Sequence, residues 1–257
     1  LTLTGGRTTG ANSFGEDTFS GGAIRSLTSG TLTIDGSTIR DSGTTGDNAD
    51  GGAIFAAGGV ALINSTLSGN NTTGQDADGG AVFVRGTLTS TQSTVSGNRV
   101  AGVNSAGGGL HATGDVVLNQ STITDNHTND PSGIGGVLWS NTGAIDISGT
   151  IIAGNTSGGT NPDLEPGSGP LSINFSLIGD RSGTSIDGNI GTGNVFDTAA
   201  QLAPLADNGG PTQTHLLLEG SPAIDAGDPG FVVPPDFDQR GSGFGRVSGN
   251  AIDIGAL

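Results

Sequence analysis

The chain has 257 residues, 50 of them glycine, and it contains neither cysteine nor lysine. Its 24 acidic and 8 basic residues give a formal net charge of −16, which argues against nucleic acid as a partner because a polyanion would be repelled. Disulfides are excluded, and no run of about 18 apolar residues predicts insertion of this segment into a membrane.

The chain begins with the strand-like sequence LTLT, without an initiator methionine or a signal-peptide pattern. We therefore expect a mature or trimmed piece of a longer protein. No helical periodicity is sustained anywhere, whereas Thr and β-branched residues are frequent, so we expect strands and almost no α-helix.

A repeat of about 28 residues starts near residue 21. Glycine pairs stand at 21–22, 51–52, 79–80, 107–108 and 135–136, at steps of 30, 28, 28 and 28 residues. Two positions after each pair comes an aliphatic residue: Ile24, Ile54, Val82, Leu110 and Leu138. These residues predict one buried column.

Two further strands follow in each repeat. The second has inward residues two positions apart, which is the spacing of one strand face: Leu32, Val60, Leu88, Val116 and Ile145, then Ile34, Leu62, Ser90, Leu118 and Ile147. The third contributes Ile39, Leu67, Val95, Ile123 and Ile152. Such strands are too short to form a core alone, but identical strands stacked from turn to turn form continuous ladders.

These columns predict an all-β fold, a right-handed parallel β-helix (solenoid) with about 28 residues per three-strand turn. We assign residues 1–200 to the coil, regular over 21–156 and degenerate over 157–200. Residues 201–257 carry most of the prolines and no repeat, and we expect them to form a C-terminal cap that keeps the open coil from pairing with other chains.

One corner of the coil carries an asparagine in each turn: Asn70, Asn98, Asn126 and Asn155, aligned with Ser42 in the first turn. Stacked amides can satisfy backbone groups at a corner, so we interpret this column as structural. Several of these residues lie in Asn-x-Ser/Thr sequons, which are frequent by chance in a chain of this composition.

The repeat elements GGAIF at 51–55 and STLSGN at 65–70 resemble those of bacterial surface proteins with pectate-lyase-like β-helices and of polymorphic outer-membrane proteins. The tail is similar to a choice-of-anchor Q domain through NPDL at 161–164, SLIGD at 176–180, LADNGGPTQTH at 205–215, GSPAIDAGDP at 220–229, DQRG at 238–241 and AIDIGA at 251–256. The resemblance implies export to the bacterial cell surface or outside the cell, with the anchor itself missing from this chain.

An outward column follows the first buried one: Arg25, Phe55, Phe83, His111 and Trp139, which we call the aromatic stripe. Beside it the corner loops carry acidic residues, Asp47, Asp50, Asp76 and Asp78, which we call the acidic rim. Sugar rings stack on aromatic faces and carboxylates bind hydroxyl groups or Ca²⁺, so the stripe is a candidate ligand-binding surface and the rim a candidate calcium site.

Two functions remain open. The first is a structural, adhesive or extracellular-matrix protein whose partners are polysaccharide or further copies of itself, since a bare first rung would permit end-to-end stacking. The second is a polysaccharide lyase or glycoside hydrolase. No catalytic residue is assigned, and His111 and Arg85 are the local candidates for its base.

Alternatively, the stripe is covered, either by the loop around Phe14 and Phe19 or by the tail around Phe231, Phe237 and Phe244, because large exposed apolar patches are costly. In the tail, Asp225, Asp238 and Arg240 are expected to tie down the cap. A threonine column, Thr38, Thr66, Thr94 and Thr122, also faces outward; a single row is too narrow for an ice-binding surface.

Overall fold

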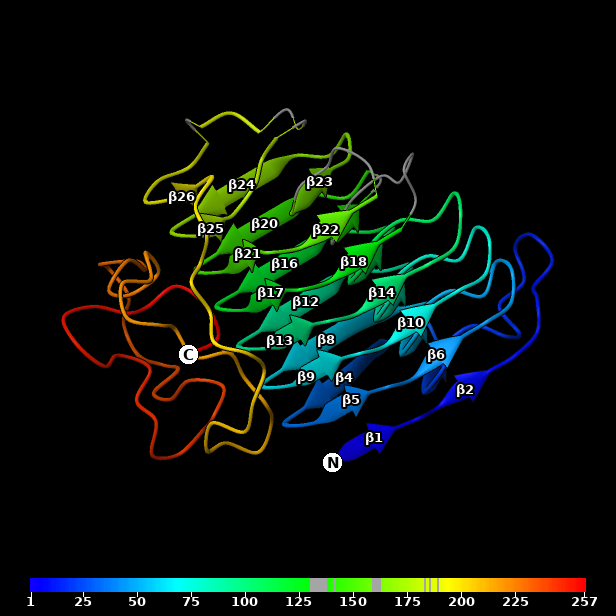
Figure 1. Cartoon of the computed structure of the whole chain (residues 1–257), viewed down its shortest axis with the longest axis horizontal. Coiled ribbons are helices and arrows are strands. Elements are labelled where there is room, and N and C mark those ends of the chain that lie inside the picture. Colours follow the sequence, from blue (N-terminus) through cyan, green and yellow to red (C-terminus); the bar gives the residue numbers. More distant parts are fainter. Residues whose placement is uncertain (130–137, 141, 159–162, 183, 185, 189) are drawn as a thin grey trace.

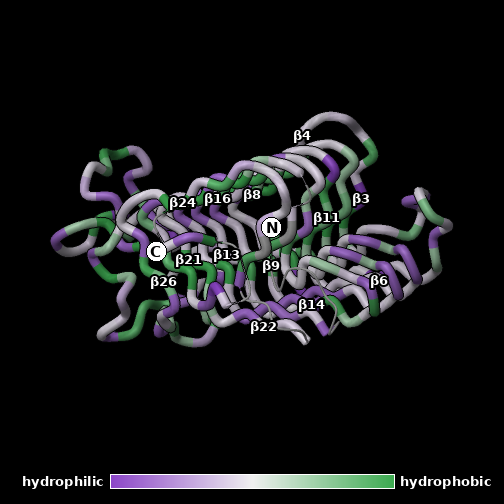
Figure 2. The backbone as a smooth tube through the Cα atoms, turned by 90° about the horizontal axis from the view of Figure 1, so that it is seen from above, coloured by the Kyte–Doolittle hydropathy of each residue, from purple (hydrophilic) through white to green (hydrophobic). Residues whose placement is uncertain are grey.

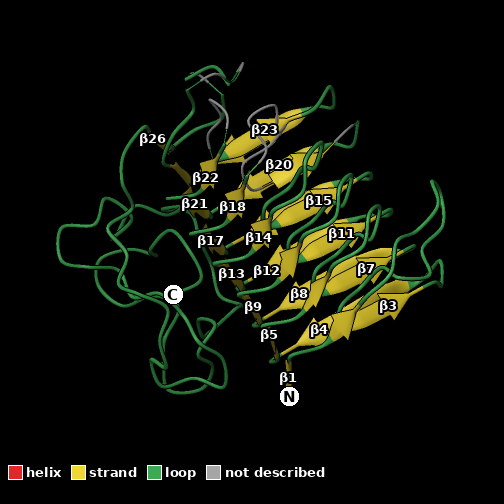
Figure 3. Ribbon diagram, turned by 45° about the vertical axis from the view of Figure 1, so that its right-hand side comes forward, coloured by secondary structure: helices red, strands yellow, loops and turns green. Residues whose placement is uncertain are grey.

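The computed structural model describes residues 1–129, 138–140, 142–158, 163–182, 184, 186–188 and 190–257. The fifth glycine pair, at 135–136, lies outside these residues, as does the side chain of Trp139. Within the described part every regular element is a strand (Figure 3). The strands pair in parallel and wind into a β-solenoid (Figure 1), which confirms the predicted fold class.

The described strands form four sheets, here called A to D. Sheet A contains β1 (Thr2–Thr4), β5 (Thr38–Arg40), β9 (Thr66–Ser68), β13 (Thr94–Ser96), β17 (Thr122–Thr124), β21 (Ile151–Ala153), β25 (Leu177–Ile178) and β26 (Val195–Phe196). Sheet B contains β2 (Arg7–Thr8), β6 (Gly43–Thr44), β10 (Asn71–Thr72), β14 (Arg99–Val100), β18 (His127–Thr128) and β22 (Thr156–Ser157).

Sheets C and D complete each turn. Sheet C contains β3 (Ile24–Ser26), β7 (Ile54–Ala56), β11 (Val82–Val84), β15 (Leu110–Ala112), β19 (Leu138–Ser140) and β23 (Leu164–Pro166). Sheet D contains β4 (Thr31–Asp35), β8 (Gly59–Ile63), β12 (Leu88–Thr91), β16 (Val116–Asn119), β20 (Ile145–Ser148) and β24 (Leu171–Asn174). These two sheets and sheet A are the three ladders that the repeat predicts.

Sheet B is a fourth ladder that the repeat does not reveal. Its strands have two residues each, directly after the asparagine corner, and in β10 only Thr72 is buried. Two residues are too few to show the alternation by which a strand is recognised in a sequence.

The predicted inner columns form one continuous core along the coil. Ile54, Val82, Leu110 and Leu138 are fully buried, and the columns of sheets A and D are buried with them from the second turn onward. Apolar positions follow one another from turn to turn (Figure 2). The polar member of a leucine column, Ser90, is accommodated by a hydrogen bond between its hydroxyl and that of Ser121, at 2.9 Å.

The glycine pairs have a backbone reason. The first glycine of a pair has a positive φ, 68° at Gly51 and 70° at Gly79, which side chains rarely tolerate. The second packs against the next turn: a Cβ on Gly52 would lie 2.2 Å from the carbonyl oxygen of Gly80. The repeat therefore retains glycine at both positions.

The asparagine corner is a directional ladder of buried amides. The Oδ1 atom of Asn98 accepts the backbone N–H and the side-chain N–H of Asn70, at 2.9 Å each, and Asn98 donates in the same way to Asn126. The ladder ends at Asp163, whose Oδ1 accepts both donors of Asn155 while its Oδ2 accepts the backbone N–H of Asp180. A carboxylate suits this end because the last side chain of the ladder accepts hydrogen bonds and has no further turn to which it must donate one.

Residues 201–257, all of them described, contain isolated bridges but no named strand. They lie along the side of the coil, against sheet A (Figure 1). Gln239 donates to the Thr66 hydroxyl at 2.9 Å and accepts from the Thr94 hydroxyl at 2.6 Å, and the Thr122 hydroxyl accepts the backbone N–H of Ala256. The outward threonine column is thus buried beneath the tail.

Farther along sheet A the outward residues change from threonine to aliphatic. Ile151 and Leu177 form a second small core with Ala223 and Ile254 of the tail. The segment expected to cap the coil therefore covers a long face of it. The described part of the chain holds no helix that could span a bilayer.

Candidate functional site

The aromatic stripe lies on the outward face of sheet C, and its members are in register. Phe83 pairs with Phe55 on one side and with His111 on the other, and His111 pairs with Trp139. The Phe55 and Phe83 rings are stacked, with centroids 5.6 Å apart and planes at 3°. The His111 ring lies 4.7 Å from Phe83, tilted by 42°. This continuous stack follows directly from the 28-residue repeat.

The stripe is covered in the first turns. Phe55 is 0%, Phe83 7% and His111 4% exposed, whereas Arg25 at the end of the stripe is exposed. These rings cannot stack on a sugar from solvent while the cover is in place. The structure thus favours the covered arrangement, and the use of these residues as a ligand-binding surface remains a prediction.

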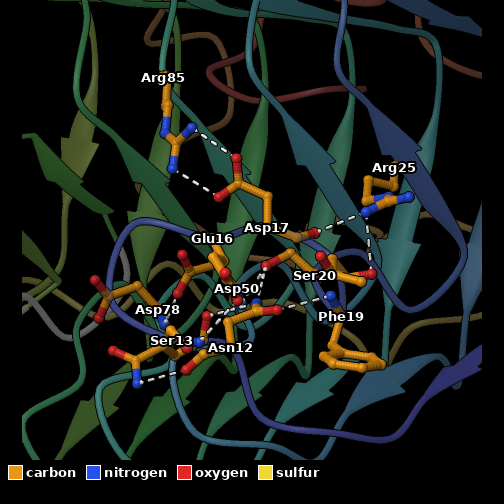
Figure 4. Close-up of polar contacts among 12 residues, drawn as sticks. Asn12, Ser13, Glu16, Asp17, Phe19, Ser20, Arg25, Asp50, Asp78 and Arg85 are labelled. Carbon is orange, nitrogen blue, oxygen red and sulfur yellow. Dashed lines mark hydrogen bonds and ion pairs between the residues drawn. The ribbon is translucent and has the colours of Figure 1, made fainter.

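Residues 12–20, here called the lid, contribute the cover through the loop that joins β2 to β3. Sixteen positions separate Thr8 from Ile24, whereas ten separate Thr44 from Ile54 in the next turn. The six additional residues allow the loop to reach across sheet C. There the Asp17 carboxylate accepts two hydrogen bonds from the Arg85 guanidinium, both at 2.7 Å (Figure 4).

Arg85 and Arg25 hold the lid from two sides. The Arg85 guanidinium also lies over the Phe55 ring, 5.2 Å from its centroid. Arg25 donates to the backbone carbonyl oxygens of Asp17 and Thr18, at 3.1 and 3.0 Å. Both cations thus act on the lid, and Arg85, a candidate base, is engaged in an ion pair.

The base of the lid is organised by a buried asparagine. Asn12, 4% exposed, donates to the Ser20 hydroxyl and to the backbone carbonyl oxygen of Asn48, and it accepts the backbone N–H of Phe19. The Ser20 hydroxyl in turn accepts the backbone N–H of Asp50. These contacts fix both ends of the lid to the second turn.

Three carboxylates of the acidic rim bond to the next turn of the coil. Asp47 accepts the backbone N–H of Gln75 at 2.8 Å, and Asp50 accepts that of Asp78 at 2.9 Å. Asp78 accepts the backbone N–H of Ala106 at 2.6 Å, and its second oxygen lies 3.2 Å from Nδ1 of His111. These side chains connect turns as the asparagine ladder does.

Asp76 differs from the other rim residues. It is exposed, has a positive φ of 53°, and accepts a hydrogen bond from the neighbouring Gln75 side chain. Among the described residues, no group of three or more His, Asp or Glu side chains is arranged to hold a metal ion. Calcium at the rim therefore remains a prediction, as does its assignment to Asp47, Asp50, Asp76 and Asp78.

A cleft of about 460 Å³ lies between the lid and the rim, lined by Phe14, Glu16, Asp50, Asp76, Asp78 and Phe83 among others. Burial raises the pKa of Asp50 to about 8, and the negative charges of Asp78 and Asp17 act in the same direction. Asp50 is therefore protonated at neutral pH. The cleft can hold a proton donor beside a carboxylate, which is the pairing that general acid catalysis requires.

The predicted tail residues fall into two places. Asp238 is buried, with 2% of its surface exposed, and its carboxylate accepts hydrogen bonds from Nε and Nη2 of Arg240. The Arg240 guanidinium also lies 4.2 Å from the centroid of the Phe244 ring. Asp225 accepts the backbone N–H groups of Asn250 and Ala251, which lowers its pKa. All three stabilise the tail internally, and the direct contacts with the coil are made by other residues.

Several important residues escaped the sequence reasoning. For Asp17 and Asn12 of the lid the sequence offers one signal, namely that the first corner loop is longer than the corresponding loop of the next turn. The sequence offered no signal for Gln239 and His215. The Nε2 atom of His215 lies 2.8 Å from the hydroxyl of Ser96, a residue of the coil 119 positions earlier. Its Nδ1 atom lies 2.7 Å from the carbonyl oxygen of Ala203, within the tail.

Comparisons with known proteins give no match to any family model, curated protein or solved structure. The structure itself shows a parallel β-solenoid with a covered aromatic stripe and a tail packed along sheet A.

Proposed function

We propose that this protein is a secreted or cell-surface scaffold, in which a rigid β-helix performs a structural or adhesive role at the surface or in the extracellular matrix. The observation that carries this proposal is that outward side chains of the coil are buried by other parts of the same chain. Phe55 and Phe83 lie under the lid, Thr66 and Thr94 lie under the tail, and each is at most 7% exposed.

The rim supports the same proposal. Side chains that would bind sugar or metal in an open groove, such as Asp47 and Asp78, accept backbone N–H groups of the following turn. Such bonds strengthen a ladder that already pairs each strand with its neighbours. A rigid coil with a net charge of −16 also remains soluble outside the cell.

The family resemblance points in the same direction. Repeats similar to those of pectate-lyase-like surface proteins and a tail similar to a choice-of-anchor Q domain both imply export. We propose on this basis that the natural chain continues into an anchor and that its partners are polysaccharide or further copies of itself.

Protease treatment of intact producing cells tests the location. An antibody against this chain should detect it on untreated cells or in the medium, and mild surface proteolysis should remove the cell-bound signal while a cytoplasmic marker persists. A signal that is released only by lysis would contradict the proposal.

A second candidate, a polysaccharide hydrolase or lyase, is favoured by one observation, the protonated Asp50 beside Asp78 in the cleft. A screen with neutral and uronate-containing polysaccharides, with and without Ca²⁺, would follow reducing ends and the absorbance of unsaturated products. The scaffold proposal expects no turnover. Turnover that is abolished by Asp50→Asn and His111→Ala, but retained in Asp35→Asn, would establish the enzyme instead.

A further inference from the structure

The lid is attached unequally at its base and at its middle. Its base is held by neutral hydrogen bonds of the buried Asn12 and of Ser20. Its middle is held across sheet C by the ion pair between Asp17 and Arg85, whose side chains are 16% and 40% exposed. An ion pair at this level of exposure stabilises only modestly, so the middle of the lid is its weakest attachment.

In the view of Figure 4 the carboxyl group of Asp50, whose pKa is raised to about 8, lies below this attachment. The Asp50 carboxyl accepts the backbone N–H of Asp78, and the residue is partly buried where it lines the cleft between the lid and the rim. The charged and titratable groups that face it from the surrounding elements are Asp17 and Glu16 of the lid, Asp76 and Asp78 of the next corner loop, Arg85 after β11, and His111 of β15 through its contact with Asp78.

We propose that residues 12–20 form a proton-controlled lid over the aromatic stripe, closed while the Asp50 carboxyl group is protonated and loosened when that group loses its proton. Ionised Asp50 would face two carboxylates, Asp17 and Asp78, with Arg85 as the nearby cation. Arg85 already neutralises Asp17. Moving the lid away exposes Asp50 more fully to water and separates Asp17 from it, which reduces both the burial and the repulsion.

The direction of the effect follows from proton linkage. The pKa of Asp50 is about 8 in the closed state and falls toward 3.8 as the group becomes more exposed, so the open state binds fewer protons between these values. The opening equilibrium constant should therefore increase with pH, by up to about tenfold per pH unit, and level off above pH 8. Acid closes the lid, and mildly alkaline solution loosens it.

Opening would uncover the stacked rings of Phe55 and Phe83 next to Arg85, the same surface that is closed in the structure. A proton-controlled lid goes beyond the scaffold function and does not depend on it, because a scaffold with a permanently closed lid would remain a scaffold.

Distance measurement between two spin labels tests the lid. The chain contains no cysteine, so Phe14→Cys, at a lid position that is 98% exposed, and Thr33→Cys, on the exposed outward side of β4, are unique labelling sites. Pulsed electron resonance at pH 5.5 should give one narrow distance distribution. At pH 9 the distribution should broaden and include longer distances, with the circular dichroism spectrum unchanged.

Two variants in the labelled background decide the cause. Asp50→Asn is isosteric with the protonated acid and cannot titrate, so it should keep the distribution narrow at both pH values. Arg85→Gln removes the ion pair and should broaden the distribution already at pH 5.5. An unchanged distribution in the parent protein between pH 5.5 and 9, or an equal broadening in Asp50→Asn, would overturn the proposal.

Discussion

The coil and the tail are ordered by two different kinds of interaction. In the coil each strand pairs in parallel with equivalent strands before and after it, and the Asn98 side chain repeats the contacts of Asn70. In the tail the bridges are isolated, and single side chains such as Gln239 make the contacts with the coil. The coil is therefore ordered by contacts that recur from turn to turn, whereas the tail is ordered by contacts that each occur once.

The strongest expected effect lies in the coil, where one residue serves several turns. Asn98→Ala removes donors to Leu67 and Asn126 and leaves two buried N–H groups of Asn70 without their acceptor. Because each orphaned buried group costs about 1–3 kcal/mol, we expect the free energy of unfolding to fall by about 4–5 kcal/mol. Urea denaturation followed by circular dichroism measures this change.

The half-buried neighbour Asn71 provides a matched control, because Asn71→Ala changes the same residue type one position along the corner. It should cost about 1 kcal/mol or less. Equal losses in the two variants would show that the ladder adds nothing beyond ordinary packing.

The next effect concerns the attachment of the tail. Gln239 is fully buried and bonds to Thr66 and Thr94 of the coil and to Thr212 of the tail. Gln239→Ala should weaken docking by about 3–4 kcal/mol, so that hydrogen exchange in 201–257 rises while that in the coil is preserved. Gln213→Ala, which alters a half-buried glutamine of the same segment, should leave exchange nearly unchanged. Uniform acceleration across the whole chain would instead mean that coil and tail unfold as one unit.

The smallest effect is a dependence of stability on pH at the end of the asparagine ladder. Burial raises the pKa of Asp163 to about 6, although hydrogen bonds from Asn155 and Asp180 act against this rise. The folded protein holds this proton more tightly than the unfolded chain does. The stability from this group is therefore complete below pH 3.8 and is lost as pH rises through 6, a change of about 3 kcal/mol.

Urea denaturation at several pH values between 4 and 7 measures this dependence. Asp163→Asn should make the slope shallower between pH 4 and 6, and the part that remains comes from Asp50, whose pKa is also raised. The amide of Asp163→Asn also faces the backbone N–H of Asp180 and lowers stability at every pH. The exposed Asp35→Asn should retain the full slope. A slope between pH 4 and 6 that is as steep in Asp163→Asn as in the parent protein would assign the whole dependence to other carboxyl groups.

The predictable part of the site is the part that the repeat encodes. The register of Phe55, Phe83 and His111 follows from a 28-residue spacing, and the structure confirms that register. Their burial does not follow from it, because the lid belongs to a single turn and repeats nowhere. A periodic pattern carries information only about positions that recur.

Two outward faces of the coil with similar sequences differ in the same way. Thr89 of sheet D is partly exposed, whereas Thr94 of sheet A is fully buried beneath the tail, although both are outward threonines of the third repeat. Nothing in the residues around Thr94 announces its partner Gln239, which lies 145 positions later. Only docking of the tail distinguishes the two faces.

The sequence by itself determined the parallel coil, its inner aliphatic columns and its asparagine corner, because stacking identical short strands is the arrangement that buries residues recurring every 28 positions. The tertiary structure alone decided that the lid closes the aromatic stripe, that the tail lies along sheet A, and that burial raises the pKa of Asp50. Each of these depends on a contact between a repeating element and a non-repeating one, and such contacts leave no period in the sequence.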